Sequence, residues 1–120
     1  MRRPTSKDLS AGLWAVRARV AVRRSADSGL DRIVVPRSPA SGLAVTGTVH
    51  RTLRATRATC LVESAVLQRW FLDHGVLKDL VVGVTAPGAG FRAHAWLEAP
   101  GQTTEDKYVE IRRLRADREP

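Results

Sequence analysis

The segment ATCLVESAVLQRWFLDHG, residues 58–75, decides how the chain folds. Its apolar residues recur at the three- and four-residue spacing of an α-helix. Thr59 or Cys60 is the expected N-cap, Glu63 can reach back from the first turn, and Gly75 suits the left-handed position after a helix end. The only cysteine of the chain therefore lies at a helix N-terminus, where unpaired N–H groups and the helix dipole favour a thiolate.

Two strand-like segments follow this helix. Residues 80–84 are a short β-branched run, and residues 91–98 alternate in polarity with His94 on the polar face. If Ala99-Pro100-Gly101 forms a three-residue hairpin loop with Gly101 left-handed, His94 stands opposite Asp106 on the next strand. Opposite side chains on one face have Cβ atoms roughly 5 Å apart, so the pair can hydrogen-bond while Glu105 points to the other face. A one-residue slip would exchange the two acids.

A thiol, a base and an acid that orients the base are the parts of a cysteine nucleophile. A lone cysteine is more often a small buried hydrophobe. The helix-start position of Cys60, with the histidine and acid downstream, favours catalysis instead. A zinc site built from Cys60, His94 and an acid is the weaker interpretation, because no second Cys or His stands at ligand spacing. We therefore expect neither a metal nor a cofactor.

These segments resemble the lasso peptide leader peptidases, the protease half of the split B-type maturation proteins, which are transglutaminase-like cysteine proteases. The resemblance rests on Thr59-Cys60-Leu61, on Val82-Gly83-Val84, on the run GFRAHAWLE at residues 90–98 and on the acid near Asp106, and it spans about residues 45–115. It implies an α+β fold with a papain/transglutaminase-like core. In that fold N-terminal helices precede a catalytic cysteine at a helix start, packed on a small antiparallel sheet that carries the histidine and the aspartate.

By the resemblance, Cys60 is the nucleophile, His94 the base and Asp106 the orienting acid. Papain-like enzymes often place a glutamine shortly before the cysteine as an oxyanion donor, but residues 53–57 read LRATR. The backbone N–H of Cys60 is the remaining oxyanion candidate.

The resemblance also implies a substrate and partners. The substrate is a ribosomal precursor peptide cut between its leader and its core, recognised through a separate leader-binding winged-helix protein. An ATP-dependent lasso cyclase would then close the ring. A transglutaminase-like acyl transferase uses the same three residues with an amine in place of water, and the sequence does not separate the two reactions.

At 120 residues we expect a single domain. It divides into a basic N-terminal helix and loop over 1–45, the protease core over 46–111 and a charged, fraying tail over 112–120. Ser6 or Asp8 is the expected cap of a first helix that runs to about Ser25, with an inward apolar stripe of Leu9, Leu13, Val16 and Val20. A second helix from Thr46 or Thr48 to about Arg57 turns Val49 and Leu53 inward and leaves His50 on the surface.

The net charge of +8 lies in the first half. Residues 1–59 hold twelve Lys and Arg against three Asp, net +9, whereas residues 60–120 hold eight against nine acids, net −1. This pattern leaves a second function class open, a non-enzymatic basic module that binds nucleic acid or an acidic protein. No zinc-finger or RNA-binding signature is present, so we expect no nucleic acid partner.

The sequence also indicates where the protein works. A single cysteine excludes an internal disulfide and fits a reducing compartment. Arg17 and Arg19 interrupt the only stretch that could serve as a signal peptide, and no apolar run reaches membrane-spanning length. We expect a cytoplasmic protein that does not bind membranes.

Overall fold

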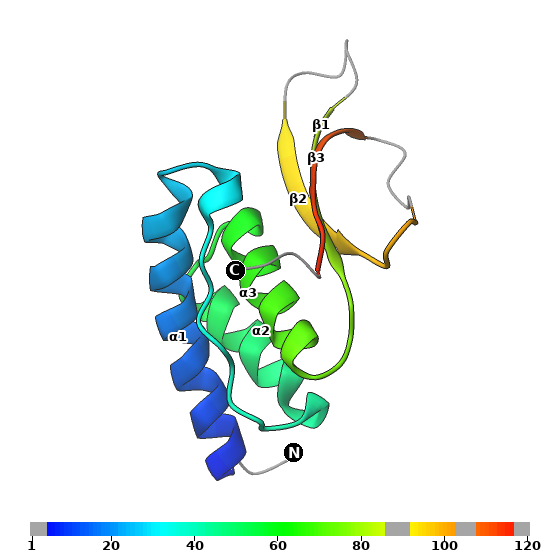
Figure 1. Ribbon diagram of the computed structural model, residues 1–120. Coiled ribbons are helices and arrows are strands. Elements are labelled where there is room, and N and C mark those ends of the chain that lie inside the picture. The colour runs from blue at the N-terminus through cyan, green and yellow to red at the C-terminus, as the bar shows by residue number, and fades with distance from the viewer. Residues whose placement is uncertain (1–4, 86–91, 103–107, 117–120) are drawn as a thin grey trace.

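The computed structural model describes residues 5–85, 92–102 and 108–116. Its elements are α1 (Ser6–Ala26), α2 (Thr46–Ala55), α3 (Cys60–Asp73), β1 (Asp79–Thr85), β2 (Ala93–Glu98) and β3 (Tyr108–Leu114), with short 3-10 turns at Leu30–Arg32 and Leu43–Val45. The three helices gather on one side and the three antiparallel strands stand on the other (Figure 1). The α+β class expected from the sequence is confirmed.

Helix α1 begins with a capping box whose N-cap is Thr5, one residue before the nearer of the two predicted caps, Ser6. Thr5 Oγ1 accepts a hydrogen bond from the Asp8 N–H at 3.3 Å, and the Thr5 N–H donates to Asp8 Oδ2 at 2.8 Å. The Thr48 hydroxyl donates to Asp8 Oδ1, which joins the start of α1 to α2. One buried acid therefore both caps α1 and fixes its position on the next helix.

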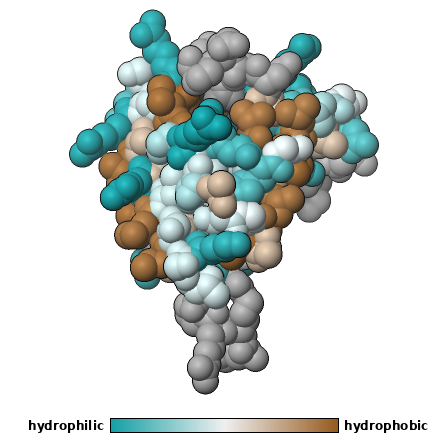
Figure 2. Space-filling view, turned by 60° about the horizontal axis from the view of Figure 1, so that its bottom comes forward, coloured by the Kyte–Doolittle hydropathy of each residue, from teal (hydrophilic) through white to brown (hydrophobic). Residues whose placement is uncertain are grey.

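The orientation of α1 is opposite to the expectation. Leu9, Leu13, Val16 and Val20 are 67%, 53%, 42% and 38% exposed. The buried face is instead made of Ala11, Trp14, Ala15, Ala18 and Val22. Both sets recur at helical spacing. The face with the alanines is the buried one because small side chains let the neighbouring helices approach closely, while Trp14 fills the remaining space. Hydrophobic and hydrophilic side chains consequently alternate along the left margin of the space-filling view, the side on which α1 lies (Figure 2).

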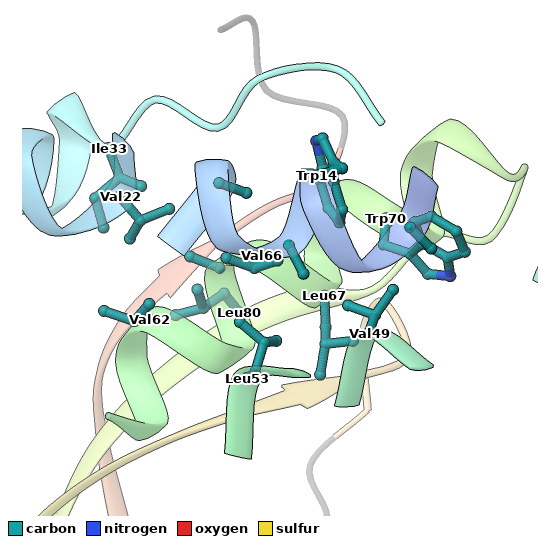
Figure 3. Close-up of a cluster of buried hydrophobic side chains, with 14 of the residues drawn as sticks. Trp14, Val22, Ile33, Val49, Leu53, Val62, Val66, Leu67, Trp70 and Leu80 are labelled. Atoms are coloured by element: carbon teal, nitrogen blue, oxygen red, sulfur yellow. The ribbon is translucent and has the colours of Figure 1, made fainter. Parts of the chain in front are cut away.

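The hydrophobic core lies between the three helices and one face of the sheet (Figure 3). Trp14 and Trp70 pack against each other toward one end of this core, with ring centroids 5.6 Å apart. Their indole nitrogens donate to the Pro36 carbonyl at 3.0 Å and to Thr46 Oγ1 at 2.9 Å. Each buried indole N–H is thus satisfied, and each bond fixes the segment leading into the next element.

Helices α2 and α3 follow the prediction. Val49 and Leu53 of α2 are fully buried. Thr59 caps α3 by accepting from the Val62 N–H at 3.3 Å, and Gly75 has φ 81° just past the helix end. These caps set the first residue of α3 at Cys60.

The sheet order corrects the predicted hairpin. The order is β2-β1-β3, so β1 lies between the other two strands and β2 does not pair with β3. Gly101 does adopt the left-handed conformation, with φ 78°, but the turn it makes does not return the chain onto β2. Strand β1 takes the central place because Leu80 and Val81, on opposite faces, are both fully buried. The expected pairing of Glu98 with Gln102, and with it the register that set His94 opposite Asp106, is therefore wrong.

The expected charged tail also needs correction. Strand β3 continues to Leu114, which is 5% exposed and belongs to the helical core. Ala116 is buried as well, and its N–H donates to Asp79 Oδ1 at 3.3 Å. A single apolar residue among arginines was too weak a signal to show that the expected strand continues past residue 111.

Candidate functional site

The nucleophile candidate stands at the first residue of α3. Cys60 is exposed, and the N-cap Thr59 precedes it in an extended conformation. Thr59 Oγ1 and the Thr59 carbonyl accept from the N–H groups of Val62 and Glu63. The N–H groups of Cys60 and Leu61 lie outside the hydrogen bonding of the helix itself, as the first N–H groups of any helix do.

Cys60 opens onto a cleft of about 400 Å³ between α3 and strand β2. One face of α3 supplies Cys60, Ser64, Leu67 and Phe71, which recur every three or four residues. Four consecutive residues of β2, His94 to Leu97, supply the opposite wall. Residues from both faces of β2 line the cleft because β2 is the edge strand of the described sheet.

His94 lines this cleft, but its ring packs on the outer face of the sheet. Leu80 and Leu97 turn toward the helices, so Gly83 and its partner His94 turn away by strand alternation. The imidazole stacks on Trp96 with ring centroids 5.5 Å apart and leans on Tyr108 at 5.2 Å. Within the described residues, no hydrogen bond joins Cys60 Sγ to His94.

A glycine makes this aromatic cluster possible. A Cβ on Gly83 would lie 2.8 Å from Trp96 Cη2 and 3.0 Å from Tyr108 Cβ. The Trp96 and Tyr108 rings, with centroids 5.5 Å apart, close over the bare backbone of Gly83, while His94 lies beside it on β2. The ring of His94 is therefore held by packing against these two aromatic side chains.

A network of charged groups holds Trp96 in turn. Its indole N–H donates to Glu98 Oε2 at 2.7 Å, and Glu98 Oε1 accepts from Arg113 Nη2 at 2.7 Å. Arg113 also donates to Asp79 Oδ2 at 2.9 Å and to Glu110 Oε1 at 3.0 Å, so one guanidinium joins all three strands. Its hydrogen bond with Glu110, followed by those with Glu98 and Asp79, raises the pKa of Arg113 above its ordinary value against the opposing effect of burial.

The structure brings a second histidine to the cleft. His50 of α2 lines it together with Glu63, and His50 Nδ1 lies 3.3 Å from Glu63 Oε1. Glu63 follows Cys60 by three residues, so both side chains lie on one face of α3. Sequence reasoning gave His50 no role, because the approach of α2 to the first turn of α3 has no signature in the sequence.

Both ring nitrogens of the third histidine, His74, make hydrogen bonds to the backbone. His74 Nδ1 lies 2.7 Å from the Trp70 carbonyl, and His74 Nε2 accepts from the Gly42 N–H at 3.1 Å. A carbonyl on one nitrogen and an N–H on the other define a neutral tautomer with both nitrogens engaged. His74 is consequently no candidate for the base, and it joins the end of α3 to the loop before α2.

The acid candidates Asp106 and Glu105 lie outside the described residues. The nearest described neighbour is Tyr108, the first residue of β3, whose ring contacts His94. Among the described residues, no three His, Cys, Asp or Glu side chains converge to hold a metal ion. No helix within the described ranges is long and apolar enough to cross a bilayer.

Comparison with known proteins gives one match. The family model described as the transglutaminase-like superfamily matches residues 9–116, from α1 to the end of the described chain. The superfamily contains enzymes of cysteine-protease or acyltransferase type. No curated protein and no solved structure matches the chain.

Proposed function

The chain belongs to the transglutaminase-like superfamily, and from this premise we propose that it is a cysteine peptidase that removes the leader from a ribosomally made lasso peptide precursor. The observation that carries the proposal is the position of Cys60, exposed at the start of α3 in a cleft whose other wall includes His94. A helix-start thiol that shares a cleft with a histidine is the arrangement that nucleophilic catalysis by cysteine needs.

The chemistry follows from these two side chains. Cys60 Sγ attacks the scissile carbonyl carbon as His94 takes the thiol proton, and the C–S bond forms. His94 returns the proton to the leaving amine as the C–N bond breaks. Water then attacks the thioester, releasing the leader as a carboxylate and restoring the thiol. The N–H groups of Cys60 and Leu61 are the oxyanion donors we propose, because the helix itself does not use them.

His94 must turn from its aromatic neighbours toward Cys60 for this step. Catalytic hydrogen bonds are often long in the free enzyme and shorten when substrate binds. The position of β2 at the edge of the sheet favours such a movement, since the His94 side chain is only partly buried and borders the open cleft.

Asp106 is the acid we propose to orient His94. The predicted hairpin register no longer supports this role, but the short distance along the chain from Asp106 to Tyr108 does. Asp106 precedes Tyr108 by two residues, a span of at most about 7 Å, and the Tyr108 ring lies 5.2 Å from the ring of His94.

The cleft suits an extended peptide. The edge of β2 offers backbone groups to an added strand, and Leu67 and Phe71 offer apolar surface beside it. We propose that a separate leader-binding winged-helix protein brings the precursor to this cleft and that an ATP-dependent lasso cyclase consumes the product. Both partners follow from the family resemblance, and the protein works with them in the cytoplasm.

Thiol modification tests the proposal. Iodoacetamide has a single thiol to alkylate, because Cys60 is the one cysteine of the chain, and this alkylation should abolish cleavage of the precursor. Cys60→Ala and His94→Ala should each be inactive, while Ile111→Ser, an exposed substitution on β3, should cleave normally. Full cleavage by the alkylated protein would refute the mechanism.

A further inference from the structure

The outward face of α1 carries an apolar ridge without a partner in the described structure. We define the α1 ridge as Leu9, Leu13, Val16 and Val20, which are between 38% and 67% exposed. Their spacing of four, three and four residues places them in one line along the helix, as in the seam of a coiled coil. An exposed apolar line of this length on a helix marks an interaction surface.

Arginines flank the ridge toward its C-terminal end. Arg17 and Arg24 are exposed, and no exposed acid stands on α1. A hollow of about 340 Å³ lies beside Val20, lined by Arg19, Val20, Arg23, Arg24 and Asp27. Arg19 Nε is buried from solvent and has no hydrogen-bond partner among residues 5–85, 92–102 and 108–116. A buried donor without an acceptor is destabilising, so an acceptor supplied by a partner carboxylate in the hollow would be favourable.

We propose that the α1 ridge docks an acidic amphipathic helix of a partner protein. The apolar side of that helix would cover Leu13 and Val16, and its flanking carboxylates would meet Arg17, Arg24 and the hollow beside Val20. This inference stands on the surface of α1 alone and does not depend on the peptidase assignment.

Two other occupants fit the surface less well. A second copy of this chain would bring its own arginines to the interface with no exposed acid on α1 to pair with them. An anionic membrane surface would suit the charge, but helices that lie in membranes present wide apolar faces with Trp or Phe. The one aromatic residue of α1, Trp14, is buried and hydrogen-bonded to Pro36.

A binding measurement on the full chain tests the proposal. The probe is a synthetic helical peptide with leucines at the spacing of the ridge and glutamates beside them, and the control peptide carries lysines instead. We expect the glutamate peptide to bind at least about tenfold tighter than the lysine peptide, a difference of about 1.4 kcal/mol, and to weaken at high salt. Leu13→Ser with Val16→Ser, and separately Arg17→Glu with Arg24→Glu, should each weaken binding by about tenfold or more.

A matched control and four contrary outcomes make the test decisive. Ile111→Ser removes an apolar side chain on β3 that is 59% exposed, like those of the ridge, and should leave peptide binding unchanged. Circular dichroism would verify that each variant folds. Equal binding of the two peptides, or binding of neither, would overturn the proposal. So would a dimer that Val16→Ser dissociates, or tight binding to phosphatidylserine vesicles that the glutamate peptide does not displace.

Discussion

The ring of Trp96 lies over Gly83, so closely that a Cβ on Gly83 would stand 2.8 Å from Trp96 Cη2. The same added atom would lie 3.1 Å from the Val109 carbonyl oxygen, which belongs to the backbone and cannot turn aside. Gly83 thus fixes how near the aromatic cluster can approach β1, and the ring of His94 packs on that cluster.

The first prediction concerns Gly83→Ala. The added methyl should push Trp96 and the start of β3 away from β1, lowering the free energy of unfolding by about 1–3 kcal/mol and reducing activity through displacement of His94. Urea denaturation followed by Trp fluorescence would measure the free energy of unfolding, and cleavage of the precursor would measure the activity. Gly12→Ala is the matched control, because its Cβ would make only ordinary contacts in α1 and should be neutral or slightly stabilising. Equal stabilities for the two variants would show that the cluster is loose.

The second prediction concerns Arg113→Met. Removing the guanidinium of Arg113 would leave Glu98 and Asp79 without their shared cation. Their side chains are 1% and 7% exposed. Breaking a buried ion pair on one side costs about 3–5 kcal/mol, so thermal unfolding should occur at a markedly lower temperature. Arg115→Met, two residues along and exposed, should change stability by less than about 0.5 kcal/mol. If both variants melt alike, the network contributes nothing to the sheet.

The third prediction concerns His50 and Glu63. The 3.3 Å contact holds the Glu63 carboxylate toward α2, in the turn that begins with Cys60. His50→Ala should free this negative charge and slow alkylation of Cys60 several-fold, because a like charge disfavours the thiolate. Adding Glu63→Gln to His50→Ala should restore the rate. If the double variant reacts as slowly as His50→Ala alone, His50 acts on the cleft by another route.

The fourth prediction separates the two acids before β3. Asp106→Asn should lower kcat/KM far more than Glu105→Gln, by a factor on the order of 10⁴ if the acid works as in serine proteases. Both substitutions remove one negative charge and keep the side-chain length, so each is the control of the other. The reverse ranking would give the orienting role to Glu105.

The sequence predicted local structure better than it predicted how helices pack and which strands pair. Helix-start and helix-end signals at Ser6, Thr59 and Gly75 gave element boundaries within a residue or two, because caps are local interactions. The predicted buried face of α1 was wrong, because two sets of apolar residues recur at the helical period and only the packing of neighbouring helices selects between them. The predicted hairpin pairing of β2 with β3 was wrong, because a turn at Gly101 does not determine which strand becomes central in the sheet.

The candidate site shows the same division. Cys60 was placed correctly, since its position depends on the cap at Thr59 alone. His94 was correctly placed on a strand, but its contact with Tyr108 was not predicted, because that contact crosses β1 and depends on the sheet order. The approach of His50 to Glu63 joins two helices and could not be read from either one.

The central claim is that Cys60 cleaves a peptide bond by way of a thioester that water then hydrolyses. The most direct measurement is mass spectrometry of the precursor after incubation in water enriched in oxygen-18, with the leader-binding partner present. The account predicts that the wild-type chain releases a leader whose new carboxylate carries one oxygen-18 atom, and that Cys60→Ala releases none. Equal release of labelled leader by Cys60→Ala, or no cleavage by the wild-type chain, would contradict it.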